Sequence, residues 1–153
     1  MTGERWTIAA SDCERCRPGL VAQPVNTLSS LAYVAAGAAV VHDARRRPRR
    51  RRSEVALGWA TVAVGLGSVA YHGPGGRLGH RAHDASLLAT LGLLAVADVE
   101  LLLGGREAPA PVLGLVGAAA VVASQPARSM EVQALAGLVA GAGLGENARA
   151  ALI

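Results

Sequence analysis

Apolar residues fall into five segments along the chain, and short stretches rich in Gly, Pro and Arg separate them. The segments cover residues of about 27–44, 54–72, 84–103, 110–124 and 131–145. A helix that crosses a bilayer needs about 20 residues, with a range of roughly 17 to 25, and the first three segments reach that length. The alternation of apolar and polar residues that is typical of barrel strands is not sustained in the sequence. The pattern predicts an all-α protein, with an extramembrane segment at residues 1–25 and a polytopic transmembrane helical bundle at residues 26–153.

The composition agrees with helices that pack inside lipid. Hydrophobic residues make up 52% of the 153 residues, yet aromatic residues make up only 3% and Phe is absent. The apolar residues are therefore mostly Ala, Val and Leu, accompanied by many Gly. Small side chains let helix backbones approach closely in a membrane. The length predicts a single domain.

Positive charge is concentrated in one loop. Seven of the fifteen basic residues, all of them Arg, lie between Arg45 and Arg52, directly after the first apolar segment. Such a run can bind nucleic acid or anionic lipid, but no aromatic residue is interleaved with it, as stacking on bases requires. We therefore expect a cytoplasmic loop that follows the positive-inside rule, and no nucleic-acid partner. The protein is then integral to a bacterial inner (plasma) membrane with its N-terminus outside, and the first 25 residues predict no cleavable signal peptide.

Two pairs of ionisable residues fall near the cytoplasmic ends of the predicted helices. They are His42 with Asp43, and Asp98 with Glu100. Charged groups are costly within a bilayer and far cheaper at its interface. We expect both pairs to anchor their helices at the membrane surface.

A polar cluster is predicted on the opposite, outer side. Ser68 and His72 end the second apolar segment four residues apart, hence on one helix face, and His80, His83 and Asp84 follow shortly. A neutral imidazole is a ready zinc ligand, a nearby hydroxyl can stabilise an oxyanion, and a carboxylate can orient an imidazole or act as a general base. Two structural alternatives remain. Ser68 can bond back to its own helix, and Asp84 can stabilise a polar helix start.

The N-terminal segment lies on the same predicted side. Glu14 and Asn26, with Gln23, offer oxygen ligands of the kind that calcium prefers, although Asn26 can equally cap a helix. Cys13 and Cys16 form a C-x-x-C pair, and no second pair or βαβ context accompanies it. We therefore expect neither a structural zinc site nor a redox centre at the cysteines.

Three ordered motifs carry a resemblance to a known family. They are the opening DCERCRPGLVAQPVNTLSSLAYVAAG (12–37), the segment GSVAYH (67–72) and the segment HDASL (83–87). Together they resemble the alkaline ceramidase family, which belongs to the CREST superfamily of seven-helix membrane hydrolases. The resemblance covers roughly residues 11–95.

This resemblance implies a fold, a cofactor and a reaction. It implies a seven-helix bundle around a zinc ion, with His72 as a ligand of the metal. Ser68 would assist at the metal or stabilise the oxyanion, and Asp84 would position or deprotonate the metal-bound water. Zinc lowers the pKa of bound water to about 7 and polarises a carbonyl. The implied reaction is hydrolysis of the amide bond of a ceramide-type lipid taken from the bilayer.

The sequence also departs from the family pattern. The family draws two further zinc ligands from an H-x-x-x-H motif on its last helix, whereas no His follows His83 here and about five helices are predicted, as in a C-terminally shortened member. A catalytic zinc normally has three protein ligands, and His80 and His83 are the local candidates to complete the set. Ser11 and Gln23 stand where the family's calcium site has acids, which disfavours calcium at Glu14. We expect a ceramidase-like hydrolase whose activity as this chain is in question, or else a non-catalytic scaffold or lipid-binding bundle.

Overall fold

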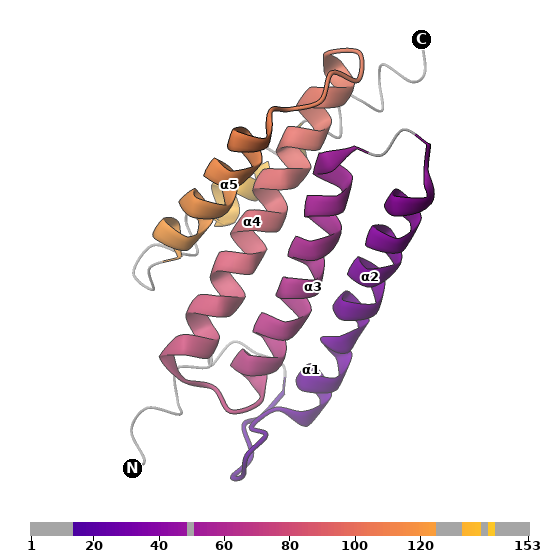
Figure 1. Ribbon diagram of the computed structural model, residues 1–153. Helices are drawn as coiled ribbons and strands as arrows, with labels where there is room; N and C mark the ends of the chain where they lie inside the picture. Colours follow the sequence, from indigo (N-terminus) through magenta and orange to yellow (C-terminus); the bar gives the residue numbers. More distant parts are fainter. Residues whose placement is uncertain (1–13, 49–50, 125–132, 139–140, 143–153) are drawn as a thin grey trace.

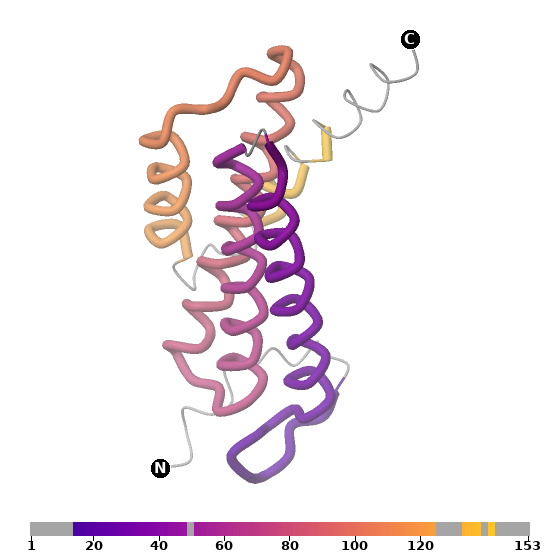
Figure 2. The backbone as a smooth tube through the Cα atoms, turned by 45° about the vertical axis from the view of Figure 1, so that its right-hand side comes forward, coloured from indigo at the N-terminus to yellow at the C-terminus, as the bar shows by residue number. Residues whose placement is uncertain are grey.

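Three long helices lie side by side in the computed structural model (Figure 1), which describes residues 14–48, 51–124, 133–138 and 141–142. The helices are α1 (Pro24–Ser29), α2 (Leu31–Arg46), α3 (Arg52–His72), α4 (Gly76–Leu102) and α5 (Ala110–Ala123). Successive long helices run in opposite directions, and α5 lies against α4, as Figure 2 shows from a second side. The described residues contain no strand, so the predicted all-α fold is confirmed.

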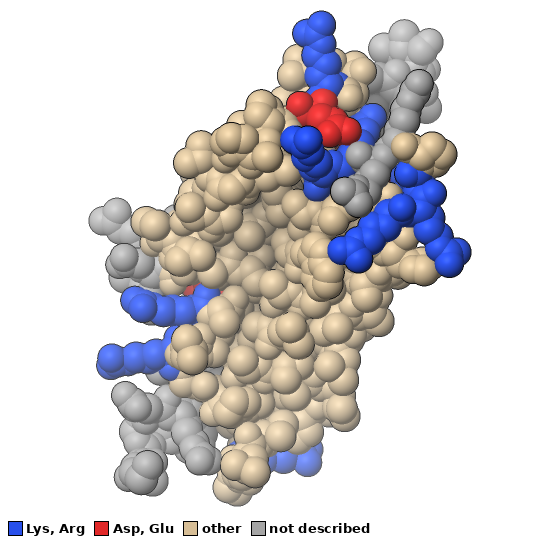
Figure 3. Space-filling model, in the orientation of Figure 1, with Lys and Arg blue, Asp and Glu red and all other residues tan. Residues whose placement is uncertain are grey.

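The long helices have the length and composition of membrane spans. Three stretches qualify: Pro24–Arg46, which joins α1 and α2, and the whole of α3 and of α4. Charged side chains gather toward the ends of the molecule in Figure 3, and the surface between them carries few. Large apolar side chains such as Leu66 on α3 and Leu28 on α1 are exposed, as lipid-facing residues would be. These features indicate a membrane protein.

Glycines set the close spacing of the long helices. A Cβ placed on Gly37 of α2 would lie 2.6 Å from the backbone oxygen of Gly58 on α3, and one placed on Gly67 of α3 would lie 2.9 Å from the backbone oxygen of Ala82 on α4. No larger side chain fits between backbones this close. The predicted contact through small residues is thus present at the α2–α3 and α3–α4 crossings.

The third long helix begins earlier than the sequence pattern predicts. We placed its start at about residue 84, where the apolar run begins, but α4 begins at Gly76. Gly75 and Gly76 have φ of 71° and 86°, a backbone region that favours glycine, and they complete the turn after α3. No proline follows them within α4, and the stretch 77–84 is already helical.

The other predicted segments differ less. Segment 27–44 corresponds to α1 and α2, which meet at Ser30, while 54–72 and 110–124 correspond closely to α3 and α5. Of the predicted segment 131–145, residues 133–138 and 141–142 are helical and the remainder lies outside the described residues.

The connections between helices divide the molecule into two ends. At one end, α3 is followed by α4, and His72, His80 and His83 lie there; we call it the histidine end. Residues 14–23, which we call the N-terminal strap, lie beside this connection. The backbone N–H groups of Ala22 and Gln23 donate to the oxygens of Gly73 and His72, each at 2.9 Å. At the other end, the arginine end, the α2–α3 loop lies near the α4–α5 loop. The fold therefore brings residues from the strap, α3 and α4 together.

Candidate functional site

His72, the last residue of α3, is held in one orientation by Gln23. Its Nδ1 lies 2.5 Å from the side-chain oxygen of Gln23, and the side-chain nitrogen of Gln23 donates to the backbone oxygen of Glu14 at 2.7 Å. That backbone oxygen can only accept, so the Gln23 amide must turn its own oxygen toward His72. Nδ1 of a neutral His72 therefore carries the proton, and the lone pair lies on Nε2. A histidine that binds a metal commonly donates its other nitrogen to a carbonyl in this way.

Further hydrogen bonds of the N-terminal strap hold Gln23 and Glu14 in place. Gln23 is 1% exposed, and its side-chain oxygen also accepts from the Asn26 side chain at 3.2 Å. The Glu14 carboxylate accepts from the backbone N–H groups of Val25 at 3.1 Å and Asn26 at 2.8 Å. It thereby satisfies two donors in the first turn of α1, which otherwise have no partner within the helix.

These contacts also change the acidity of Glu14. Desolvation raises the pKa of the Glu14 carboxyl, but the two backbone hydrogen bonds and the nearby Arg17 and His72 outweigh it and bring the pKa below its ordinary value of 4.5. Both carboxylate oxygens already accept hydrogen bonds. The calcium role expected for Glu14 and Asn26 stays a prediction, and in this structure both residues serve the start of α1.

Asp84 lies between two histidines on α4. Its Oδ2 is 3.1 Å from Nε2 of His80, one turn earlier, and its Oδ1 is 3.3 Å from Nδ1 of His83. The Asp84 side chain is 5% exposed, whereas those of His80 and His83 are 26% and 23% exposed. A buried carboxylate flanked by two imidazoles can accept a proton and pass it on, which is the chemistry of a general base.

Tyr71 brings the histidines of α3 and α4 together. The centroid of its ring lies 4.8 Å from that of His72, 5.3 Å from that of His80 and 5.2 Å from that of His83. The rings of His72 and His83 are themselves 6.2 Å apart. Three imidazoles from two helices thus surround one buried aromatic ring, next to Asp84.

Ser68 belongs to the same region of α3. It lies one turn before His72 and is 4% exposed. Its neighbour Gly67 meets α4 at Ala82 and His83, where a Cβ would lie 2.9 Å from the backbone nitrogen of His83. The close crossing therefore holds the Ser68 segment against the part of α4 that carries His83 and Asp84.

The donors can be compared with what zinc requires. Among the described residues, no three His, Cys, Asp or Glu side chains form a group that could bind one metal ion. Two imidazoles on one zinc, at about 2.0–2.1 Å per bond, would have ring centroids roughly 5 Å apart, which is less than the 6.2 Å between His72 and His83. That zinc binds at His72 stays a prediction; among the described residues, Nε2 of His72 is an imidazole nitrogen whose orientation is fixed by a contact at the other ring nitrogen.

Two residues contribute to this site that the sequence pattern did not predict. Gln23 was considered only as an oxygen donor to calcium, and its contact with His72 depends on a strap whose path no local pattern reveals. Tyr71 directly precedes His72. The chain has only two tyrosines, so the position of this one next to His72 could have indicated that it belongs to the site. Cys16 is part of the strap, while Cys13 lies outside the described residues.

A second polar network lies at the arginine end. Glu100 on α4 is 2% exposed; its carboxylate accepts from the Ser53 hydroxyl at 2.5 Å and from the Ala108 backbone N–H at 2.7 Å. Asp98 is 6% exposed. Both acids were expected to anchor α4 at the membrane surface, but they are buried, and Glu100 ties α3, α4 and the α4–α5 loop together.

Comparison of this chain with family models, with curated proteins and with solved structures found no match.

Proposed function

We propose that this protein is a membrane hydrolase of the alkaline ceramidase type, which cleaves the amide bond of a ceramide-type lipid. The observation that carries the proposal is the buried Asp84 carboxylate between His80 and His83, beside a His72 of fixed orientation. Buried ionisable clusters are costly and concentrate at functional sites. The cluster lies at one end of helices that are long enough to span a bilayer, where a lipid amide would lie.

Asp84 is the proposed base in this reaction. In amide hydrolysis, the oxygen of a water molecule attacks the carbonyl carbon while a base takes one of its protons. The same proton then passes to the amide nitrogen, the C–N bond breaks, and a fatty acid and an amine are released. His80 and His83, at 3.1 and 3.3 Å from the carboxylate oxygens, keep Asp84 in position for both transfers.

Ser68 and His72 have separate proposed roles. The Ser68 hydroxyl would donate a hydrogen bond to the oxyanion that forms at the carbonyl. His72 would bind zinc through Nε2, because its Nδ1 already donates to Gln23. A bound zinc ion would make a water molecule acidic enough to ionise near neutral pH and would polarise the carbonyl. The roles of Asp84 and Ser68 follow from their own chemistry and burial.

The decisive experiment measures fatty-acid release from a short-chain fluorescent ceramide by the full chain in detergent micelles. We expect release by the wild type and a fall of at least about 100-fold in Asp84→Asn, the lower range for loss of a general base. Asp43→Asn is the matched control, because this exposed carboxylate lies at the end of α2 and bonds only to Arg47 among the pairs described. A melting curve for each variant shows whether it is folded.

Two results would contradict the proposal: no release by folded wild-type protein, or equal release by wild type and Asp84→Asn. The zinc role has its own measurement, the metal content of purified wild type and His72→Ala. Zinc that is present in the wild type and lost in the variant supports it, and any other result contradicts it without touching the role of Asp84.

A lipid-binding bundle without catalysis is the second candidate. An apolar cavity of about 390 Å³ between α4 and α5 favours it, since cavities of this size and lining hold small apolar ligands. This cavity lies at the arginine end, away from the histidines. Retained lipid without fatty-acid release would favour this second function.

A further inference from the structure

We propose that the arginine end binds an anionic phospholipid, with the phosphate group at Arg47 and Arg51 and one acyl chain in the cavity between α4 and α5. This site is separate from the histidine end and does not depend on the hydrolase proposal. It is carried by two neighbouring cavities of opposite character, one polar and one apolar, on the two sides of a single loop.

The polar cavity lies between the α2–α3 loop and the α4–α5 loop. It has a volume of about 660 Å³, and Arg47, Arg51, Glu54 and Glu107 contribute the charged side chains that line it. Arg51 reaches across to the second loop, where a Cβ placed on Gly105 would lie 3.0 Å from its Nη2. Arginine presents a planar fork of donors that matches phosphate oxygens.

The two arginines and two glutamates that line this cavity balance in charge, so the preference for an anion comes from the further arginines that flank them in the sequence. Arg47 is shared between Asp43 and Glu54, the latter at 3.5 Å. The sequence from 45 to 52 nevertheless contains seven Arg and no acidic residue. The N-terminus of α3, which begins at Arg52, adds the positive end of its helix dipole. No acidic residue of the loop sequence itself balances this positive charge.

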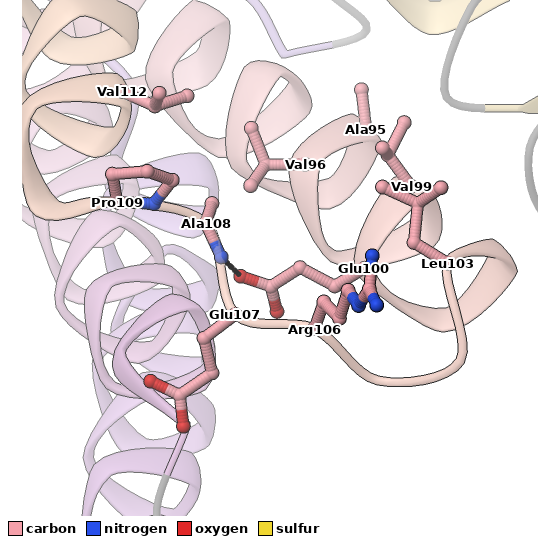
Figure 4. Close-up of a pocket in the computed structure, with 10 residues that line it drawn as sticks. All are labelled: Ala95, Val96, Val99, Glu100, Leu103, Arg106, Glu107, Ala108, Pro109 and Val112. Carbon is pink, nitrogen blue, oxygen red and sulfur yellow. Dashed lines mark hydrogen bonds between the residues drawn. The ribbon is translucent and has the colours of Figure 1, made fainter.

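The apolar cavity lies on the other side of the α4–α5 loop. Figure 4 shows its wall of Ala95, Val96 and Val99 from α4 and Leu103 just after this helix, with Pro109 and Val112 opposite. Glu100 also reaches this cavity, but both of its oxygens are engaged by Ser53 and Ala108. Glu107 lines both cavities, so only the loop separates them.

An anionic phospholipid is the class of ligand that matches both cavities. An acyl chain fits the apolar wall, and a phosphate fits the arginines. The arginines follow directly on the apolar spans that end at Arg46 and begin at Arg52, which is the level of the lipid headgroups. Basic pockets between membrane helices are known to hold acidic headgroups. A neutral lipid would use only the apolar cavity, and a free phosphate only the polar one.

The test uses the purified full chain in neutral detergent, titrated with dioleoyl phosphatidylglycerol while the melting temperature and the lipid retained in native mass spectrometry are recorded. We expect a rise in melting temperature and one retained lipid. In Arg47→Gln/Arg51→Gln the affinity should fall about 25-fold, since each basic residue near a membrane surface contributes roughly fivefold. Arg77→Gln/Arg81→Gln is the matched control, because these exposed arginines lie at the start of α4, at the other end.

Further ligands separate the contribution of the phosphate group from that of the acyl chain. The proposal would be overturned if dioleoyl phosphatidylcholine or inorganic phosphate raised the melting temperature as much as dioleoyl phosphatidylglycerol does. It would also be overturned if the two double variants lost the same affinity for dioleoyl phosphatidylglycerol. Val99→Trp tests the acyl chain, since Val99 is 52% exposed and a larger side chain there enters the cavity without displacing the core. We expect weaker binding of the dioleoyl lipid and unchanged binding of dihexanoyl phosphatidylglycerol; equal effects on both would overturn the acyl assignment.

Discussion

One buried amide, that of Gln23, joins three parts of the histidine end. Gln23 is nearly fully buried and connects His72, Asn26 and the backbone of Glu14 through its one amide group. Removal of the amide in Gln23→Ala takes this acceptor from the partly buried Nδ1–H of His72. The loss of one hydrogen bond of this kind costs about 0.5–1.5 kcal/mol. We therefore expect Gln23→Ala to lower the melting temperature in detergent by several degrees.

Asn26→Ala is the matched control for Gln23. It removes one side-chain donor at 3.2 Å and leaves the contact between Gln23 and His72 intact. We expect a smaller loss of stability than in Gln23→Ala. If the two variants melt at the same temperature, the Gln23 amide does not hold His72 in the way described.

Glu14 makes the stability of the N-terminal strap depend on pH. Its pKa in the folded protein is lowered below 4.5 by the net effect of its hydrogen bonds and cationic neighbours. A lowered pKa stabilises the folded state above the unfolded value, and this contribution is lost as the pH falls through the folded value. Wild type should therefore melt above Glu14→Gln at about pH 7, and the difference should shrink as the pH falls below 4.5. A difference that is constant over this range would contradict the assignment.

The crossing of α3 and α4 depends on Gly67 and Gly79. A Cβ on Gly67 would meet the backbone of His83 at 2.9 Å, and one on Gly79 would meet the backbone oxygen of Ala70 at 2.6 Å. Backbone atoms cannot give way as a side chain does, so Gly67→Ala must separate the helices. Overpacking of this kind costs about 1–3 kcal/mol, and we expect a correspondingly lower melting temperature.

Gly114→Ala on α5 is the control for this substitution. Nothing lies within 4 Å of a Cβ at that position, and Ala favours a helix over Gly by roughly 0.5–1 kcal/mol. We expect Gly114→Ala to melt at or above the wild-type temperature. Equal destabilisation by both variants would show that the α3–α4 crossing is not the cause.

The helices themselves could be predicted from the apolar pattern, whereas the start of α4 could not. The pattern marks where a helix enters lipid, but residues 77–84 are polar and form the same helix before that point. Their helical state depends on the Gly75–Gly76 turn and on the contact between His80 and Asp84, one turn apart. A hydrophobicity pattern records neither effect.

The candidate site could be predicted as a region but not as a set of contacts. Ser68, His72 and Asp84 were placed on one side by helix count alone, and the structure describes them at one end. The carboxylate partner of His80 and His83 is local and was predicted, but the partner of His72 was not, because Gln23 lies 49 positions away in the sequence. Such long-range contacts depend on how the whole chain closes.

At the scale of the molecule, the clustering of arginines in the α2–α3 loop predicts how the protein sits in a membrane. The arginine end carries the seven arginines of residues 45–52, and the histidine end carries the N-terminal strap with Cys16. From the positive-inside rule we expect the arginine end to face the cytoplasm. In a Cys13→Ser background, we expect a membrane-impermeant maleimide to label Cys16 in intact cells. Arg46→Cys, in a chain that also carries Cys16→Ser, should react only after permeabilisation, since six arginines remain to fix the orientation. The reverse pattern would place the histidine site in the cytoplasm and the proposed phospholipid site in the outer leaflet.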